Sequence, residues 1–360
     1  MKNLLVTGGA GFIGSNFVRY LLQHEPQVRI INLDALTYAG SLENLRHLPD
    51  PNRHIFVQGN ICDEALVQRL FTEYEIDTVV HFAAESHVDR SIYDPQSFIN
   101  TNIYGTYVLL ETARRVWLSG ERDLEETRFH HISTDEVFGS LKVEDPPFSE
   151  STPYAPNSPY AASKAASDHL VRAYGHTYGL PYTLTNCSNN YGPYQYPEKL
   201  IPLTIMNALQ GQYLPIYGDG QQVRDWLYVE DHCEAIWQVL RKSPSGETYN
   251  IGGGNQPINL TVVETICDIL DEVSPASPYV PHRQLIRFVA DRPGHDRRYA
   301  MDITKIQNSL GWRPRHTLQE GLLQTVKWYL DHTDWVDAIR NRREYQQWLE
   351  KHYAAPGGNP

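Results

Sequence analysis

The glycine-rich segment near the start of the sequence places the strongest constraint on the fold. Gly8, Gly11 and Gly14 follow the apolar run 4–6 and open a helical stretch, so they connect a predicted strand to a predicted helix. Glycines at this spacing allow a tight turn, close approach of the backbone to a pyrophosphate, and close packing of helix on strand. The first turn of such a helix presents unpaired N–H groups and a positive dipole end to phosphates. The segment therefore predicts a dinucleotide-binding unit.

A carboxylate further along the chain indicates which dinucleotide is bound. Asp34 lies 20 residues after Gly14, at the end of the second predicted strand. A carboxylate at this position suits the hydroxyls of an adenosine ribose and repels a 2′-phosphate, which favours NAD over NADP. The alternative is a purely structural turn followed by an unrelated acid.

The first half of the sequence alternates short apolar runs with helical stretches. The runs are continuous, as expected where helices cover both faces of a parallel sheet. This alternation predicts an α/β fold with a doubly wound, parallel, Rossmann-type sheet. The predicted strands span residues 3–7, 29–33, 55–57, 78–82, 129–133 and 182–185, and the helical stretches include 14–23 and 65–74.

A second, smaller domain is predicted because 360 residues exceed what one hydrophobic core usually supports. Glycine and proline become frequent from about Ser188, and short strands are expected at 249–251 and 286–289. We expect an NAD-binding Rossmann domain over 1–187, with an interleaved return at 225–252. A smaller α+β substrate-binding domain is expected over 188–224 and 253–360.

Charge and cysteine usage limit the partners. The net charge of −12 and the pI near 5.7 argue against nucleic acid, which requires a basic face. The four cysteines are scattered, so neither a metal site nor a disulfide framework is expected, and a cytoplasmic location fits best. No targeting segment is recognised, and no run reaches the roughly 20 apolar residues that span a bilayer.

Tyr160 and Lys164 form the first candidate catalytic pair. They lie four residues apart, hence on one face of a helix that Pro159 is suited to begin. A lysine beside a tyrosine lowers the phenol pKa from about 10, which makes a phenolate base available for alcohol oxidation. The alternative is a solvated helix surface.

Thr134, Asp135 and Glu136 follow the fifth predicted strand and face the same crevice. Ser133 or Thr134 is suited to hydrogen-bond an oxygen that becomes a carbonyl. The two adjacent acids are interpreted as a general acid and a base whose pKa values are separated by their environments. A second interpretation is that Asp135 only caps the following turn.

These motifs resemble those of the extended short-chain dehydrogenases/reductases, and within that superfamily the dTDP-glucose 4,6-dehydratases. The resemblance covers nearly the whole chain. The Asp135–Glu136 pair is its most diagnostic feature, because related epimerases and decarboxylases typically lack the aspartate. The matching segments are 83–91, 134–136, 160–164, 189–194, 199–202, 224–226 and 291–296.

The resemblance implies a three-stage reaction with NAD. Tyr160 takes the proton from the glucose C4 hydroxyl as C4 is oxidised. Glu136 removes the C5 proton and Asp135 protonates the departing C6 hydroxyl, which expels water. Hydride then returns to C6 and a proton to C5, which gives a 4-keto-6-deoxy sugar.

Two binding sets and a catalytic set are predicted from the motifs and the resemblance. The catalytic residues are Thr134, Asp135, Glu136, Tyr160 and Lys164. The cofactor-binding residues are Gly8, Gly11, Phe12, Ile13, Gly14, Asp34, Thr37, Asn60, Ile61, Phe82, Ala83, Ala84, Ser86, Thr101, Tyr160, Lys164 and Asn190. The substrate-binding residues are Ser86, Thr134, Asn189, Lys199, Leu200, Pro215, Tyr217, Arg224, Asn259, Arg292, His295 and Tyr353.

The sequence departs from the family pattern at two positions. Asn60 stands where relatives usually carry aspartate near adenine, and Phe138 replaces a tyrosine. The family is typically dimeric, and residues 100–113 are a plausible interface helix in a homodimer. Two alternatives remain open: a UDP-sugar 4-epimerase or UDP-glucuronate decarboxylase, and a non-catalytic NAD-binding protein.

Overall fold

A seven-stranded parallel sheet forms the larger lobe of the computed structural model, which describes residues 1–119, 123–291, 296–343 and 345–346. The strand order is β10-β6-β5-β4-β1-β2-β3, and every neighbouring pair is parallel. From β1 the chain adds β2 and β3 on one side of the sheet, and it then adds β4 on the other side of β1. A crevice therefore opens between β1 and β4 at their carboxyl ends. The strands are β1 Asn3–Thr7, β2 Arg29–Asp34, β3 His54–Gln58, β4 Thr78–His81, β5 Arg128–Thr134, β6 Tyr182–Cys187 and β10 Glu247–Ile251.

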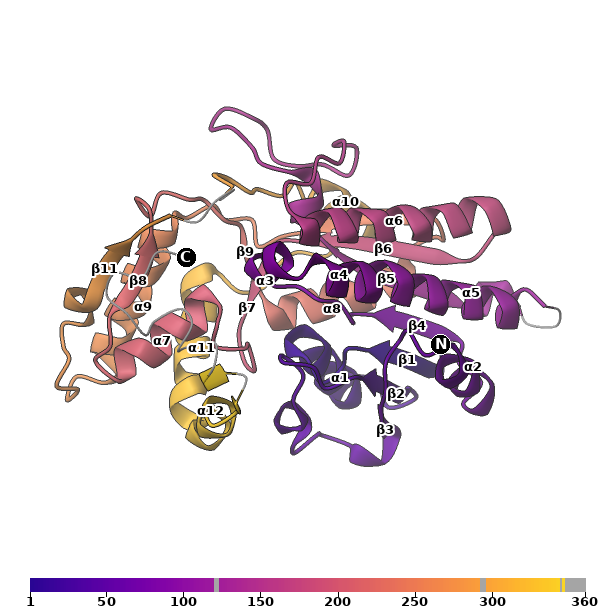
Figure 1. The fold of residues 1–360 in the computed structure, drawn as a ribbon, viewed down its shortest axis with the longest axis horizontal. Helices are drawn as coiled ribbons and strands as arrows, with labels where there is room; N and C mark the ends of the chain where they lie inside the picture. The colour runs from indigo at the N-terminus through magenta and orange to yellow at the C-terminus, as the bar shows by residue number, and fades with distance from the viewer. Residues whose placement is uncertain (120–122, 292–295, 344, 347–360) are drawn as a thin grey trace.

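Helices cover both faces of this sheet (Figure 1), as the continuous apolar strands require. Helices α1 and α8 pack together on one face, and α2, α5 and α6 cover the other. The central strands are inaccessible to solvent, with Leu4, Leu5 and Val6 all 0% exposed. These helices are α1 Phe12–His24, α2 Glu64–Glu73, α5 Thr106–Trp117, α6 Pro159–Tyr178 and α8 Val229–Lys242.

The predicted interface helix at 100–113 is part of a longer helical segment with four sections. Helices α3 Val88–Tyr93 and α4 Pro95–Phe98 are followed by a π-helical stretch Ile99–Gly105, which continues into α5. Helix α4 begins where the Asp94 side chain accepts a hydrogen bond from the Ser97 backbone. The segment starts at the loop after β4, so its first turns border the crevice.

The smaller lobe has its own hydrophobic core, built around Ile201, Ile205, Val262, Leu322 and other residues of this lobe. It contains two short parallel pairs, β8 with β11 and β7 with β9, and lies to the left of the main sheet in Figure 1. Its elements are β7 Asn189–Tyr191, α7 Leu200–Leu209, β8 Leu214–Tyr217, β9 Trp226–Tyr228, α9 Asn259–Val273, β11 Ile286–Val289, α11 Leu318–Asp331 and α12 Thr333–Arg340.

One segment of the C-terminal part returns to the larger lobe. Helix α10 Thr304–Leu310 packs on β10 and α8, and Met301 forms a bridge with Phe148. Trp312 is buried in the same core cluster as Ile251. We therefore propose that residues 299–312 belong with the larger lobe. We also propose that the interleaved return covers α8 and β10, because β9, at its predicted start, packs in the core of the smaller lobe. The remaining turns of helix are short 3-10 segments at Leu42–Leu45, Pro51–Arg53, Leu124–Glu126, Asp135–Phe138 and His282–Leu285.

Three further observations concern the chain as a whole. All four cysteines are free thiols. In the described part of the chain, no group of three or more histidine, cysteine or acidic side chains is arranged to hold a metal ion. None of the helices within the described ranges combines the length and apolar character needed to cross a membrane.

Candidate active site

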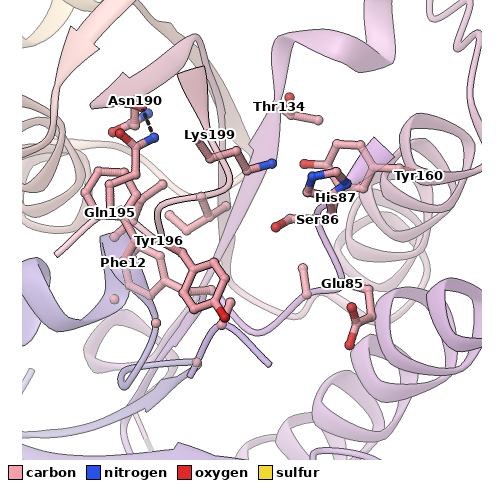
Figure 2. Close-up of a pocket in the computed structure, with 18 of the residues that line it drawn as sticks. Phe12, Glu85, Ser86, His87, Thr134, Tyr160, Asn190, Gln195, Tyr196 and Lys199 are labelled. Carbon is pink, nitrogen blue, oxygen red and sulfur yellow. Dashed lines mark hydrogen bonds between the residues drawn. The ribbon is translucent and has the colours of Figure 1, made fainter. Parts of the chain in front are cut away.

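A cleft of about 500 Å³ lies between the two lobes, at the carboxyl ends of the central strands. This volume falls within the range of small-molecule and cofactor sites. Figure 2 shows residues of both lobes facing it: Phe12, Thr134 and Tyr160 come from the larger lobe, and Asn190, Tyr196 and Lys199 from the smaller one. Gln195 donates a hydrogen bond to the Asn190 backbone carbonyl at 2.9 Å, which ties together the loop on the smaller-lobe side.

The glycine segment adopts a backbone conformation that leaves no room for a Cβ atom at Gly8 or Gly14. Gly8 has a φ of 73°, and a Cβ there would lie 2.7 Å from the Ala83 backbone nitrogen. A Cβ on Gly14 would overlap the Gly8 carbonyl oxygen. The turn therefore brings β1, the loop after β4 and the start of α1 together without side chains between them. This backbone cradle fits a pyrophosphate.

Asp34 lies at the end of β2 and links this cradle to the next loop. Its two carboxylate oxygens accept hydrogen bonds from the backbone nitrogens of Ala10 and Leu36, both at 2.8 Å. Burial raises the pKa of the Asp34 carboxyl, and these two hydrogen bonds oppose the rise. A carboxylate has about four acceptor positions, so Asp34 retains capacity for ribose hydroxyls.

Asn60 follows β3 on the edge of the same cleft. Its side-chain oxygen accepts a hydrogen bond from the Cys62 backbone nitrogen at 2.9 Å. An aspartate would accept the same bond, which explains how this loop keeps its turn with the amide in place of the family's usual acid.

Tyr160 and Lys164 are both buried on the face of α6 that meets the sheet, 8% and 4% exposed. Helix α6 begins at Pro159, as predicted. Ser158 caps it, because its hydroxyl accepts a hydrogen bond from the Ala161 backbone nitrogen. Burial and the charge of Glu136 hold the pKa of the Tyr160 phenol well above its usual value. The lysine-driven decrease expected from the sequence is therefore wrong for this structure, because desolvation of the phenolate dominates.

The acidic pair lies on the 3-10 turn that follows β5. The Thr134 hydroxyl accepts from the Glu136 backbone nitrogen at 3.3 Å, so Thr134 caps this turn and Asp135 does not. Asp135 is 2% exposed. Its Oδ1 accepts from Thr134 at 3.2 Å, while Oδ2 has no hydrogen-bond partner among the described residues.

The environment of Asp135 favours its protonated form. Burial first, and then the charges of Glu136 and Asp225, raise the pKa of its carboxyl well above the usual value. Glu136 is partly exposed and lines the cleft. Two adjacent carboxyl groups thus have different surroundings, which suits one of them to donate a proton.

The smaller lobe contributes polar groups to the opposite wall. Arg224 is 6% exposed, and its guanidinium donates to the Val223 and Asp296 carbonyls at 2.8 and 2.9 Å. The Lys199 side chain extends from its loop toward the side of the cleft that holds Thr134 and Tyr160 (Figure 2). Cationic groups at this wall suit an anionic ligand.

Every predicted site residue that the structure describes lines this one cleft. The catalytic and cofactor-binding sets are there in full, as are Ser86, Asn189, Leu200, Pro215, Tyr217 and Asn259 of the substrate-binding set. Arg292, His295 and Tyr353 lie outside the described residues.

The sequence analysis missed a partly buried cluster beside the cleft, to which Tyr38, His87 and Glu198 contribute lining side chains. The Arg90 guanidinium lies 3.6 Å from the centre of the Tyr38 ring, and an Arg90 Nη2 lies 3.8 Å from the Glu198 carboxylate. His87 Nε2 lies 3.7 Å from the same carboxylate oxygen. His87 and Arg90 were inside a recognised motif without an assigned role, whereas Tyr38 and Glu198 carried no signal of their own. Only the fold brings these three loops together.

Phe138 lies behind the acidic pair, in an aromatic cluster. Its ring stacks on Phe148 at a centroid distance of 5.1 Å and meets the edge of Tyr154 at 5.2 Å. Phe138 is 4% exposed, so this departure from the family pattern is a packing difference in the core.

Known proteins resemble the chain over nearly its whole length. The family model described as GDP-mannose 4,6 dehydratase matches residues 5–325. A dTDP-glucose 4,6-dehydratase of Salmonella typhimurium is 55% identical over 359 residues, which cover 97% of this chain and 98% of the relative.

Solved structures give the same relationship. A dTDP-glucose 4,6-dehydratase of Streptomyces venezuelae, solved with NAD and TYD bound, has a TM-score of 0.84 and 47% identity, covering 94% of this chain and 99% of that one. A UDP-glucose 4-epimerase of Thermotoga maritima has a TM-score of 0.79 and 30% identity, covering 92% of this chain and 99% of that one. Together with the acidic pair at the cleft, these matches show that the chain belongs to the dTDP-glucose 4,6-dehydratase family.

Proposed function

We propose that this chain dehydrates dTDP-glucose to dTDP-4-keto-6-deoxyglucose with NAD as its cofactor. The observation that carries the proposal is Asp135, a buried carboxyl with a raised pKa in the same cleft as Tyr160 and the glycine cradle. A carboxyl group whose surroundings favour its protonated form suits loss of water from a sugar, which needs a general acid that simple alcohol oxidation does not need.

The cofactor fits the residues present. The side-chain-free turn at Gly8, Gly11 and Gly14 suits the pyrophosphate, and Asp34 suits the adenosine ribose. When bound, NAD supplies a reversible hydride acceptor for oxidation at C4 and reduction at C6. The predicted cofactor-binding residues remain our proposal for its contacts.

The protein's own groups move the protons. Tyr160 is proposed to take the proton of the C4 hydroxyl. Burial and the charge of Glu136 raise the pKa of its phenol, and its hydrogen bond with Thr134 opposes that rise. The resulting ketone acidifies C5, whose proton passes to Glu136. Asp135 protonates the C6 hydroxyl, which leaves as water, and a proton later returns to C5. All three groups line the same cleft, which supports these proposed roles.

The smaller lobe is proposed to bind the nucleotide diphosphate. Lys199 and Arg224 supply cationic donors, and Asn259, the first residue of α9, adds a polar side chain to the same wall. Arg292, His295 and Tyr353 remain proposed contacts by resemblance alone.

The epimerase alternative predicts a different fate for hydrogen. Dehydration exchanges the C5 hydrogen with solvent, whereas 4-epimerisation leaves C5 untouched. Turnover in deuterium oxide should therefore place one deuterium at C5 of the product, measured by proton magnetic resonance. Product without deuterium at C5 would contradict the proposed elimination.

Substrate choice is tested directly with a panel of dTDP-, UDP-, CDP- and GDP-glucose. Each nucleotide sugar is incubated with the protein and NAD, and the products are followed by mass spectrometry. We expect dTDP-glucose to lose one water, with the highest kcat/KM of the panel. Preference for another nucleotide would move the proposal to that substrate, and absence of water loss from all four would end it.

We also propose that the protein is a cytoplasmic homodimer that pairs through the α3–α5 segment. This segment exposes large apolar side chains: Ile92 is 50% exposed, Tyr93 62%, Ile99 54% and Tyr104 43%. Exposed apolar side chains gathered on one segment suit burial against a second copy, so we take the exposed surface of this segment as the proposed dimer face. The reduced state of all four cysteines supports the cytoplasm.

The dimer is tested by placing a charge on that face. Ile99→Glu should give a monomer in light scattering after size-exclusion chromatography, because a carboxylate cannot be buried there without a partner. Val143→Glu is the matched control, since Val143 is 76% exposed on a loop outside this face. A dimeric Ile99→Glu protein would exclude this interface.

A further inference from the structure

The inward face of α6 carries a third ionisable residue that the proposed reaction does not use. Asp168 lies one helical turn beyond Lys164, as Lys164 lies one turn beyond Tyr160. Asp168 is 0% exposed. A carboxylate this deep in a protein carries a large desolvation cost unless donors surround it.

Three side chains surround the Asp168 carboxylate. Ser133 and Tyr154 donate their hydroxyl protons to Oδ2 at 2.7 and 2.8 Å, and His131 Nε2 lies 3.1 Å from Oδ1. Arg172 in turn donates to the Tyr154 hydroxyl at 2.9 Å. Burial opposes ionisation, but the hydrogen bonds of His131 and Ser133 and the charge of Lys164 act against it, and the pKa of the Asp168 carboxyl is lowered. Asp168 is therefore a buried anion.

Lys164 is the cation that this anion faces. Its Nζ donates to the Ile132 backbone carbonyl at 2.7 Å and lies 3.5 Å from His131 Nε2. Burial lowers the pKa of the Lys164 ammonium, and the charge of Asp168 opposes that decrease. Without Asp168, the ammonium would be a buried charge held mainly by a neutral carbonyl.

His131 stands between the two charges as a neutral spacer. Burial, followed by the charge of Lys164, lowers the pKa of its imidazole to about 4. The other titratable or charged groups near the pair come from β4, β6, the loop before α6 and α6 itself. They are His81, Cys187, Tyr154, Tyr160 and Arg172.

We propose that Asp168 is a positioning residue that keeps Lys164 a cation and holds it, across His131, at the end of β5 beside Tyr160. The proposal rests on the roles proposed above for Tyr160 and Lys164. It adds Asp168, one helical turn further along α6, as the residue that positions Lys164. A cationic Lys164 is the form that suits ribose hydroxyls of the cofactor as a donor and a phenolate as a neighbour.

The test is the pH dependence of NAD⁺ affinity, measured by calorimetry on the full-length protein. Affinity should fall at alkaline pH as Lys164 loses its proton. In Asp168→Asn this alkaline limb should move to lower pH by about one to three pH units, the usual effect of a close opposite charge. A folded Asp168→Asn protein with the wild-type limb would overturn the proposal.

Two variants separate charge from packing. Tyr154→Phe removes one hydrogen bond to the Asp168 carboxylate but keeps the charge of Asp168. The alkaline fall in NAD⁺ affinity of this variant should therefore match that of the wild type. If Asp168→Asn does not fold, the double variant Tyr154→Phe/Asp168→Asn is used, because it removes the Tyr154 hydroxyl that would crowd the new amide. Its NAD⁺ affinity should fall at the same lowered alkaline pH. A shifted limb in Tyr154→Phe alone, or an unshifted one in the folded double variant, would also overturn the proposal.

The outcome is independent of the substrate. If the wild-type protein dehydrates no nucleotide sugar, the proposed function fails while the affinity profile still reports on Asp168. If turnover of dTDP-glucose is normal and the limb does not move, only the role of Asp168 fails.

Discussion

The two lobes meet at one cleft but are built in different ways. In the larger lobe, the site residues follow regular parallel strands or lie on one long helix, and neighbouring strands fix their relative positions. In the smaller lobe, the residues at the cleft lie mainly on loops and element ends between three-residue and four-residue strands. The larger lobe thus presents a fixed chemical wall, and the smaller lobe presents a wall suited to recognition. Substitutions in the first should change kcat, and substitutions in the second should mainly change KM.

The largest expected effect is on the larger lobe. Tyr160→Phe removes the proposed base, so the first hydride transfer should slow by about 10²–10⁴-fold. The measurement is the growth of NADH absorbance after rapid mixing with dTDP-glucose. Absorbance growing at the wild-type rate would contradict the role of Tyr160 and the contrast between the lobes.

A second substitution in the larger lobe should separate the stages of the reaction. Asp135→Asn removes the general acid, so water loss should slow by about 10²–10⁴-fold while oxidation at C4 continues. NADH should then accumulate during a single turnover, with little dehydrated product in quenched samples. Full turnover by this variant would refute the assignment.

The smaller lobe should respond through binding. Lys199→Met removes a cationic donor, and the loss of one charge-assisted hydrogen bond, about 1.5–3 kcal/mol, should raise KM about 10- to 150-fold. Steady-state kinetics should show a much smaller change in kcat. Lys199→Arg keeps the charge and serves as the control; a fall in kcat with an unchanged KM in Lys199→Met would place Lys199 with the chemistry.

The smallest expected effect is on stability and concerns the burial of Asp135. Because the folded-state pKa of this acid is raised, the folded protein binds its proton more tightly than the unfolded chain does. Between the unfolded pKa of about 3.9 and the raised folded value, the free energy of unfolding should therefore fall as pH rises. Asp135→Asn removes this loss. The free energy of unfolding of the variant, measured with urea, should therefore increase relative to that of the wild type as pH rises. A pH-independent difference would show that Asp135 is not the titrating group.

The features that could be predicted are those that depend on residues close together in the sequence. The strand at 286–289 was predicted at its observed limits because three residues with high strand propensity, Ile286, Phe288 and Val289, lie in a stretch bounded by prolines. The glycine cradle and the Tyr160–Lys164 pair also follow from short-range spacing. The return of residues 299–312 to the larger lobe was not predicted, because it depends on contacts with β10 and α8, more than fifty residues away in sequence.

The amino-acid sequence by itself determined the type of fold and the cofactor class, and it supplied the side chains that we propose as reacting groups. These follow from apolar periodicity, from glycines that no larger residue can replace, and from side chains with the required chemistry. The tertiary structure decided the charge states, because burial and distant neighbours set them. For example, burial raises the pKa of the Tyr160 phenol, although the nearby Lys164 had predicted a lowered pKa. The tertiary structure also surrounded Asp168 with donors from β5 and the loop before α6. Desolvation and long-range contacts exist only once the chain has folded, so these features have no local signal in the sequence.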